Sequence, residues 1–168
     1  MITWQDIQQC YQRTLRELQA LVPTDKWQTQ PQLIQLTQHK TKYGMADIKG
    51  VVYINQAFIG SEADGLLDVT IRHELAHLCV GIDQGHNAHF KSCARLFKAN
   101  FGQHLKTQTQ AINEAIGFKY KLFARLENQQ EILFKTVHRK HAKYLNYKPK
   151  FFSYLTIKGQ KVLSFRYE

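Results

Sequence analysis

Cysteine is scarce in this chain of 168 residues, which contains only Cys10, Cys79 and Cys93. Their number is odd, their spacings are wide and no Cys-x-x-Cys pair occurs. Neither a disulfide framework nor a zinc site built on thiolates is therefore expected. We expect the three thiols to be small buried side chains in a reducing cytoplasm.

Long apolar runs are also missing, and none approaches the roughly 18 residues needed to cross a bilayer. The first nine residues lack the basic and apolar regions of a secretory signal. We expect a cytoplasmic protein without membrane contact, associated with the nucleoid if it is bacterial. The hydrophobic content of 43% is enough for a core, and the length fits one domain or one domain with a small appendage.

Acidic residues are few, with 13 Asp and Glu against 23 Lys and Arg, and the formal net charge of +10 favours a polyanionic partner. The charge is uneven, because residues 118–168 hold twelve Lys and Arg and three Glu, which leaves +9 of the +10 there. Aromatic residues lie between these cations, an arrangement suited to binding DNA phosphates and stacking on unpaired bases. The alternative is a charged β-surface whose aromatics form its own core. The candidate nucleic-acid contacts are Lys119, Lys121, Arg139, Lys140, Lys143, Lys148 and Lys150.

Hydrophobic periodicity predicts an α+β fold with a break near Gly117. Residues 1–117 are predicted to form one domain and residues 118–168 a small basic β-rich module. In the first domain, Gly44 is expected in a turn, Ser61 to Asp64 in a capping box, Asn87 as a helix N-cap and residues 101–117 as a poorly defined helix or loop. Helices are predicted at 3–22, 62–80 and 88–100, and strands at 33–37, 48–55, 118–122, 132–137 and 162–167, with a hairpin turn at 158–160.

The sequence His73-Glu74-Leu75-Ala76-His77 lies in the second predicted helix. Residues four apart differ by about 40° around a helix, so both imidazoles can face one metal ion. Glu74 is rotated by about 100° from His73 and lies beside the ligands, where a carboxylate can take a proton from water activated by the metal. The apolar stripe of Leu67, Ile71, Leu75 and Leu78 occupies the opposite side of the helix, which turns the histidines toward a cleft.

A catalytic zinc ion usually has three protein ligands, and three downstream residues compete for the third place. Asp83 has the metzincin offset of six residues from His77, but Gly81 comes one residue too late for the metzincin turn. His86 precedes the predicted helix, where a loop can bring it under the metal. His89 is the least favoured ligand and is instead a candidate contact to the substrate or the transition state.

The HExxH segment, together with Gly85-His86 and Phe90, resembles the SprT-like (Spartan-type) zinc metalloproteases, as does the preceding strand that ends in Ile54-Asn55. The resemblance covers about residues 3–101. It implies a zincin-like domain with an N-terminal helix, a small mixed sheet, the HExxH helix and a following helix. It also implies one catalytic Zn²⁺ held by His73, His77 and His86, with Glu74 as the general base.

Two features depart from the family pattern, because Asn87 replaces a glycine and no cysteine follows Cys93 to form a zinc ribbon. The resemblance implies a zinc-dependent endopeptidase that acts on DNA-associated proteins, with DNA–protein crosslinks as a substrate class. By analogy with zincins, an extended substrate is expected to pair with the strand Val51–Asn55. The alternative is a non-enzymatic nucleic-acid-binding protein whose metal site is structural.

Overall fold

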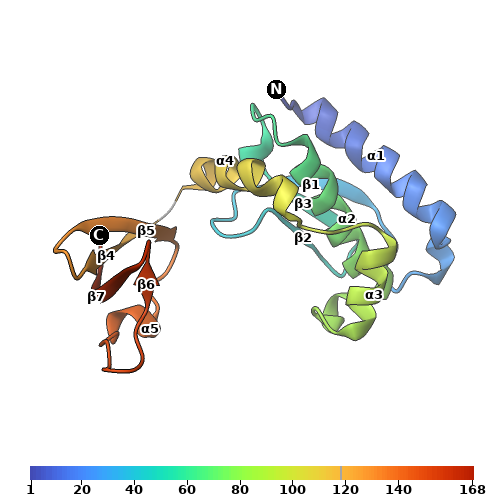
Figure 1. The fold of residues 1–168 in the computed structure, drawn as a ribbon. Helices are drawn as coiled ribbons and strands as arrows, with labels where there is room; N and C mark the ends of the chain where they lie inside the picture. The colour runs from blue at the N-terminus through green and yellow to red at the C-terminus, as the bar shows by residue number, and fades with distance from the viewer. Residues whose placement is uncertain (118) are drawn as a thin grey trace. The chain divides into compact units, whose positions relative to one another are not determined.

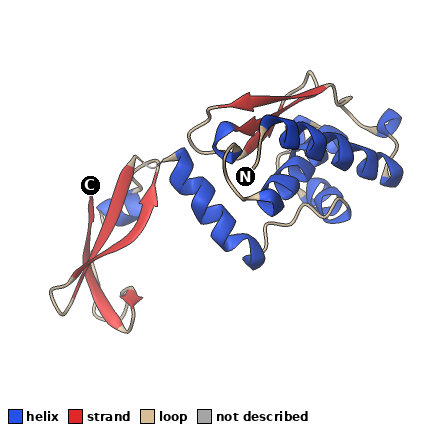
Figure 2. Ribbon diagram, turned by 90° about the horizontal axis from the view of Figure 1, so that it is seen from above, coloured by secondary structure: helices blue, strands red, loops and turns tan. Residues whose placement is uncertain are grey.

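The computed structural model describes residues 1–117 and 119–168, which form two compact units, Met1–Ile116 and Gly117–Glu168. Helices and a small sheet are present in each unit, so the predicted α+β class is confirmed (Figures 1 and 2). Among the described residues, no helix combines the length and the apolar character needed to cross a membrane.

The N-terminal unit is built around α2, whose apolar stripe is fully buried as predicted. Helix α1 packs against α2 and begins with a capping box, in which Thr3 Oγ1 accepts from the backbone N–H of Asp6 and an Asp6 oxygen accepts from that of Thr3. The elements of this unit are α1 (Trp4–Leu21), β1 (Leu33–Thr37), β2 (Gly44–Ala46), β3 (Val51–Asn55), α2 (Asp64–Val80), α3 (Ala88–Leu96) and α4 (Lys106–Ile116).

The sheet of this unit has the strand order β1-β3-β2, with β1 parallel and β2 antiparallel to β3. The prediction of a turn at Gly44 and a strand from Ile48 was wrong. Gly44 begins β2, and the turn lies between Asp47 and Gly50, where Asp47 Oδ1 accepts from the backbone N–H groups of Lys49 and Val51. Because β3 has a partner on both sides, it has no free edge for a substrate strand, and the two edges of this sheet are β1 and β2.

The start of α2 also differs from its prediction. Ser61 forms no capping box, because its hydroxyl donates to the carbonyl of Phe58 at 2.8 Å and accepts from the N–H of Ala63. The helix therefore begins at Asp64, without a side-chain cap.

Helix α3 begins as predicted, because Asn87 Oδ1 accepts from the N–H of Phe90. It ends at Leu96, four residues before the predicted end, since Lys98 adopts a positive φ of 57°. The segment 101–117, which had no clear prediction, contains α4, and the side chain of Ile112 anchors this helix in the core.

The C-terminal unit is an antiparallel sheet with the order β5-β4-β7-β6 around buried Ala124, Leu126 and Val162. Lys158 and Gly159 form the predicted hairpin turn, and both have positive φ, as a two-residue type I′ turn requires. The predicted start of the first strand at Phe118 lies outside the described residues. The unit contains β4 (Tyr120–Leu126), β5 (Glu131–Val137), a short α5 (Ala142–Leu145) that was not predicted, β6 (Thr156–Ile157) and β7 (Gln160–Tyr167).

Candidate metal centre

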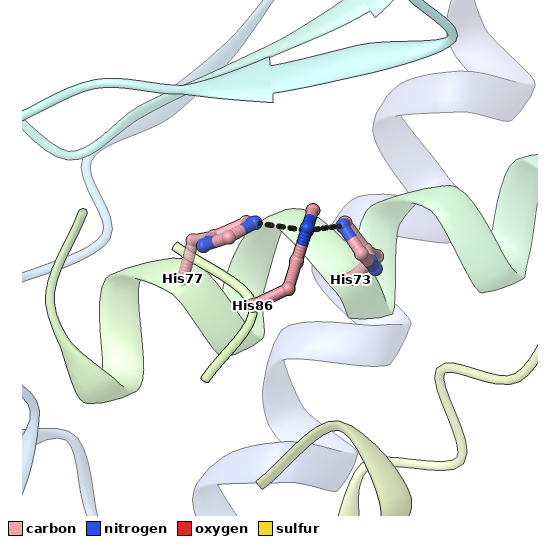
Figure 3. Close-up of side chains that lie close together, drawn as sticks. All are labelled: His73, His77 and His86. Atoms are coloured by element: carbon pink, nitrogen blue, oxygen red, sulfur yellow. Dashed lines mark hydrogen bonds between the residues drawn. The ribbon is translucent and has the colours of Figure 1, made fainter. Parts of the chain in front are cut away.

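Three histidine side chains converge beside α2. His73 and His77 lie one helical turn apart, with ring centroids 5.0 Å from each other. His86 reaches them from the loop before α3, so that its Nε2 lies 3.0 Å from His73 Nε2 and 3.2 Å from His77 Nε2 (Figure 3). One ligand atom from each of the three residues lies within 4.8 Å of the other two.

The loop that carries His86 depends on two glycines with positive φ. The chain leaves α2 at Gly81, where φ is 107°, passes through the 3₁₀ turn Ile82–Gln84 and reverses at Gly85, where φ is 55°. A side chain at either position is strained in these conformations. The two glycines therefore set the path that brings His86 back over the helix.

The three rings suit a metal ion better than they suit one another. An N–H group at His86 Nε2 can donate a hydrogen bond to only one of its neighbours, His73 Nε2 or His77 Nε2. A metal cation can instead accept a lone pair from all three nitrogens at once. Tetrahedral zinc with bonds of about 2.0–2.1 Å sets its nitrogen ligands roughly 3.4 Å apart. The separations of 3.0 and 3.2 Å lie close to this value, so the residues fit the ion.

Burial keeps two of these imidazoles neutral. It lowers the pKa of His73 to about 4, with smaller contributions from the positive forms of His77 and His86. The pKa of His77 is likewise lowered to about 4, chiefly by burial and then by His86 and Lys42. Both rings are therefore uncharged at neutral pH, the form that binds metal. His73 Nδ1 is buried and has no hydrogen-bond partner among the described residues, whereas a histidine that binds a metal usually donates its other N–H group to a nearby acceptor.

Two phenylalanine rings pack against the three histidine rings. Phe90, in the first turn of α3, stacks on His77 with centroids 4.2 Å apart and meets the rings of His73 and His86 edge-on at 4.9 and 4.7 Å. Phe101, which the sequence did not single out, contacts His73 at 5.4 Å from the chain beyond α3.

Glu74 lies beside the histidines and is only 7% exposed. Burial raises its pKa to about 8, and the positive charge of Lys42 opposes this rise. Gly44 allows the carboxyl to lie there, because a Cβ on Gly44 would come within 3.0 Å of Glu74 Cγ and 2.8 Å of Thr70 Cγ2. The side chain of Glu74 is thus enclosed between α2 and β2.

A cleft of about 440 Å³ opens over this group. The whole of β2 borders it, together with the residues just before that strand. The sequence did not predict that these residues border the cleft, because Gly44 was expected in a turn and not in a strand. The cleft is lined by Thr41, Lys42, Tyr43, Gly44, Met45, Ala46, Thr70, His73, Glu74, His77, Ile82, His86 and Phe101.

Asp83 and His89, the other two residues considered for the metal, do not join the histidine cluster. Both line a different hollow, beside Val80 and Gln84, and only Ile82 contributes to this hollow and to the cleft. In this arrangement Asp83 is not placed as a ligand, and His89 is not placed to contact a substrate in the cleft.

The basic candidates of the C-terminal unit are all exposed, and none of them forms an ion pair within the described chain. Lys119 and Lys140 lie over the ring of Tyr120, and Lys143 lies over that of Tyr144. The candidates are Lys119, Lys121, Arg139, Lys140, Lys143, Lys148 and Lys150.

Two pairs of aromatic side chains in this unit have different surroundings. Tyr144 and Tyr147 pack edge-on against Phe165 and belong to the unit's own core. Phe151 and Phe152 are 84% and 93% exposed and contact each other edge-on. Tyr144 and Tyr147 therefore fit the interpretation of aromatics that pack within the unit, and stacking of Phe151 and Phe152 on bases stays a prediction.

Comparison of the chain with family models, with curated proteins and with solved structures found no match. Function is therefore argued from the geometry of the site.

Proposed function

We propose that the N-terminal unit is a zincin-like peptidase domain of the SprT-like class, which hydrolyses proteins associated with DNA. One observation carries the proposal: three histidine Nε2 atoms converge beside a buried glutamate, in a cleft that borders an open strand edge. A purely structural zinc site usually has four protein ligands, whereas three ligands and an open cleft leave a place for water and substrate.

The departure at Asn87 is explained by its role in the fold. Its φ of −69° requires no glycine, and its side chain caps α3. Asparagine is therefore compatible with the geometry that presents His86.

His73, His77 and His86 are the residues that would hold the ion. Zinc bound there supplies Lewis-acid polarisation of a peptide carbonyl and lowers the pKa of water to about 7. Glu74 accepts the proton from the attacking water and delivers it to the departing amine. Burial raises the pKa of Glu74, and the positive charge of a bound zinc ion would oppose this rise and favour the carboxylate that accepts the proton.

Strand β2 is the element best placed to hold the substrate. It pairs with β3 along one edge only, and its residues line the cleft. An extended peptide that adds to the free edge would pass over Glu74 and the histidines, and its backbone hydrogen bonds would align the scissile carbonyl.

The substrate class rests on the charge of the C-terminal unit. Seven exposed lysines and arginines that form no ion pair in the part of the chain that the structure describes suit a phosphate backbone, and exposed Phe151 and Phe152 suit stacking on unpaired bases. This unit would hold the peptidase near proteins bound to DNA.

Glu74→Gln tests the proposal, since the amide keeps the size of the side chain but cannot accept the proton. We expect the variant to retain one zinc per chain and to cleave a DNA-bound protein about 10²–10⁴-fold more slowly than the wild type. Metal content and cleavage are measured with and without DNA. Equal cleavage by both proteins, or no cleavage by zinc-loaded wild type with DNA present, contradicts the peptidase and favours the non-enzymatic alternative.

A further inference from the structure

A second hollow, with a volume of about 540 Å³, lies beside the C-terminal end of α2. This volume is within the range of roughly 300–1,000 Å³ that is typical of ligand pockets. Ile82 lines both the hollow and the cleft over the histidines, so the two are neighbours on the surface. Asp83 and His89 are the titratable side chains among the described residues that line the hollow, and neither belongs to the histidine cluster.

Three aliphatic side chains form the apolar part of this lining. Ile48, in the turn after β2, is 79% exposed, so most of its surface is accessible to a ligand. Val80 is the last residue of α2, and Ile82 follows it on the way to the loop of His86. An aliphatic chain that lies across these residues would remove apolar surface from water on both sides of the contact.

Asp83 adds a negative charge to this apolar lining. Its carboxylate is exposed, accepts a hydrogen bond from Gln84 Nε2 at 3.4 Å and forms no ion pair within the part of the chain that the structure describes. Gly81 leaves room for the group, because a Cβ at that position would come within 2.8 Å of Asp83 Oδ1. The hollow therefore offers a carboxylate that is free to receive a cation.

We propose that this hollow binds the side chain of a lysine or arginine in the substrate, and that Asp83 pairs with its charged group. Both side chains carry a cation at the end of an aliphatic stem, which matches an apolar wall next to a carboxylate. The path of the peptide rests on the proposed peptidase function. Proteins that bind DNA place lysines and arginines against its phosphates, so this preference suits the proposed substrates.

The position of the hollow predicts where the basic residue lies relative to the scissile bond. Gly44, the first residue of β2, lies against Glu74, whereas Ile48 comes two residues after the end of that strand. A peptide paired with β2 rises by about 3.3 Å per residue, as the strand itself does. A peptide whose scissile bond lies over Glu74 should therefore reach the hollow within about four residues, always on the same side of the bond.

Matched peptides, assayed without DNA, measure this preference. The products of a randomised peptide mixture are sequenced to find the position, which then carries lysine, norleucine or glutamate. Norleucine keeps the aliphatic stem and lacks the charge. We expect zinc-loaded full-length protein to cleave the lysine peptide with a kcat/KM about three- to fivefold higher than the norleucine peptide, the effect of one exposed ion pair. The glutamate peptide should be cleaved most slowly.

Substitutions of Asp83 assign the preference to this hollow. Asp83→Asn keeps the size of the side chain and removes its charge, so the ratio of the lysine to the norleucine rate should fall to unity. Asp83→Lys should favour the glutamate peptide. Glu62→Gln, an exposed position before the other end of α2, is the matched control. It removes the same charge from the same unit and should keep the wild-type ratio.

The outcomes separate this inference from the proposed function. Equal cleavage of the lysine and norleucine peptides by the wild type, or a lysine preference that Asp83→Asn retains, overturns the inference and leaves the peptidase standing. If the wild type cleaves no peptide, the peptidase is contradicted, and binding then decides about the hollow.

Binding is measured by calorimetry on zinc-loaded Glu74→Gln with a lysine-containing peptide and its norleucine counterpart. We expect the lysine peptide to bind about three- to fivefold more tightly, and the difference to vanish when Asp83→Asn is added. Equal binding of the two peptides, or no binding of either, overturns the inference.

Discussion

Gly44 lies where β2 passes over α2. Its lack of a side chain lets the strand approach Thr70 and Glu74 of that helix closely. The nearest atoms to a Cβ at this position would be Thr70 Cγ2 at 2.8 Å, Glu74 Cγ at 3.0 Å and the carbonyl oxygen of Tyr53 at 3.1 Å. A methyl group would therefore press on both the strand and the glutamate.

Gly44→Ala should lower the free energy of unfolding by about 1–3 kcal/mol because it overpacks this contact. It should also reduce cleavage by displacing Glu74. The matched variant Gly44→Ala/Thr70→Ser removes the nearest atom while keeping a hydroxyl, which donates to the carbonyl of Leu66 in the wild type. Urea denaturation and peptidase assays should show partial recovery in the double variant, and equal losses in both variants would contradict the packing argument.

Sequence periodicity was sufficient to place some site residues and not others. His73, Glu74 and His77 follow from the repeat of a single helix, and the opposed apolar stripe is buried as predicted. The position of His86 depends on the path of the loop through Gly81 and Gly85. Residue spacing alone did not decide which downstream residue is the third metal ligand. Lys42 and Phe101 come from segments without a periodic pattern, and only tertiary packing brings them to the cleft.

Hydrogen bonds from Asn55, the last residue of β3, hold the chain segment at the rim of the cleft. Asn55 is 3% exposed, and its amide donates to the carbonyl oxygens of His39 and Lys42 at 2.6 and 2.9 Å, while its Oδ1 accepts from the N–H of Ala57. These bonds fix the segment that leads from β1 into β2.

Asn55→Ala should destabilise the N-terminal unit by about 1–3 kcal/mol, because the carbonyl groups of His39 and Lys42 lose the donor that the buried amide supplies. Amide hydrogen exchange in residues 39–46 should become faster, since the rim of the cleft is no longer tied to β3. Gln56→Ala, at the neighbouring exposed position, is the control and should leave exchange unchanged. Unchanged exchange in Asn55→Ala would show that the rim is held by other contacts.

Helices α1 and α2 are joined by a group of charged side chains around Asp68. Arg72 donates to Asp68 at 2.7 Å and to Glu17 of α1 at 2.6 Å, and Thr14 of α1 donates to Asp68 at 3.2 Å. Burial by itself would raise the pKa of Asp68, but these hydrogen bonds and the charge of Arg72 outweigh it, so its pKa lies below the ordinary value.

This lowered pKa predicts the direction of a pH effect. Asp68 stabilises the fold above its unfolded pKa of about 3.9, and this contribution is lost as the pH falls through the lower folded value. Asp68→Asn should therefore be less stable than the wild type at pH 7, by about 1–3 kcal/mol. The difference should shrink below about pH 4, and a difference that stays constant in denaturation series from pH 7 to 2 would contradict the assignment.

The sequence predicted long elements better than short ones. The predicted first helix agrees with α1 to within one residue at each end because it carries a clear helical repeat, and β1 has the predicted bounds. The three residues of β2 are too few to show alternation, and the four of α5 too few to show a helical period. These short elements are specified by the partners against which they pack.

At the scale of the whole molecule, the charge is concentrated in the second unit, where +9 of the +10 is located. Lys148→Ala and Lys150→Ala should each weaken DNA binding and reduce the slope of log affinity against log salt by about 1. Lys49→Ala, an exposed lysine of the N-terminal unit, is the control and should leave the slope unchanged. A salt-independent affinity, or equal effects of all three substitutions, would contradict the assignment of DNA contacts to the second unit.

The central claim is that three histidines hold one catalytic zinc ion, and anomalous diffraction at the zinc edge from crystals of the full-length protein tests it most directly. We predict a single peak about 2.0–2.1 Å from the Nε2 atoms of His73, His77 and His86. Glu74 should lie beside the peak without bonding to it. No peak in crystals grown with zinc, or a peak bound by Asp83 in place of His86, would contradict the account.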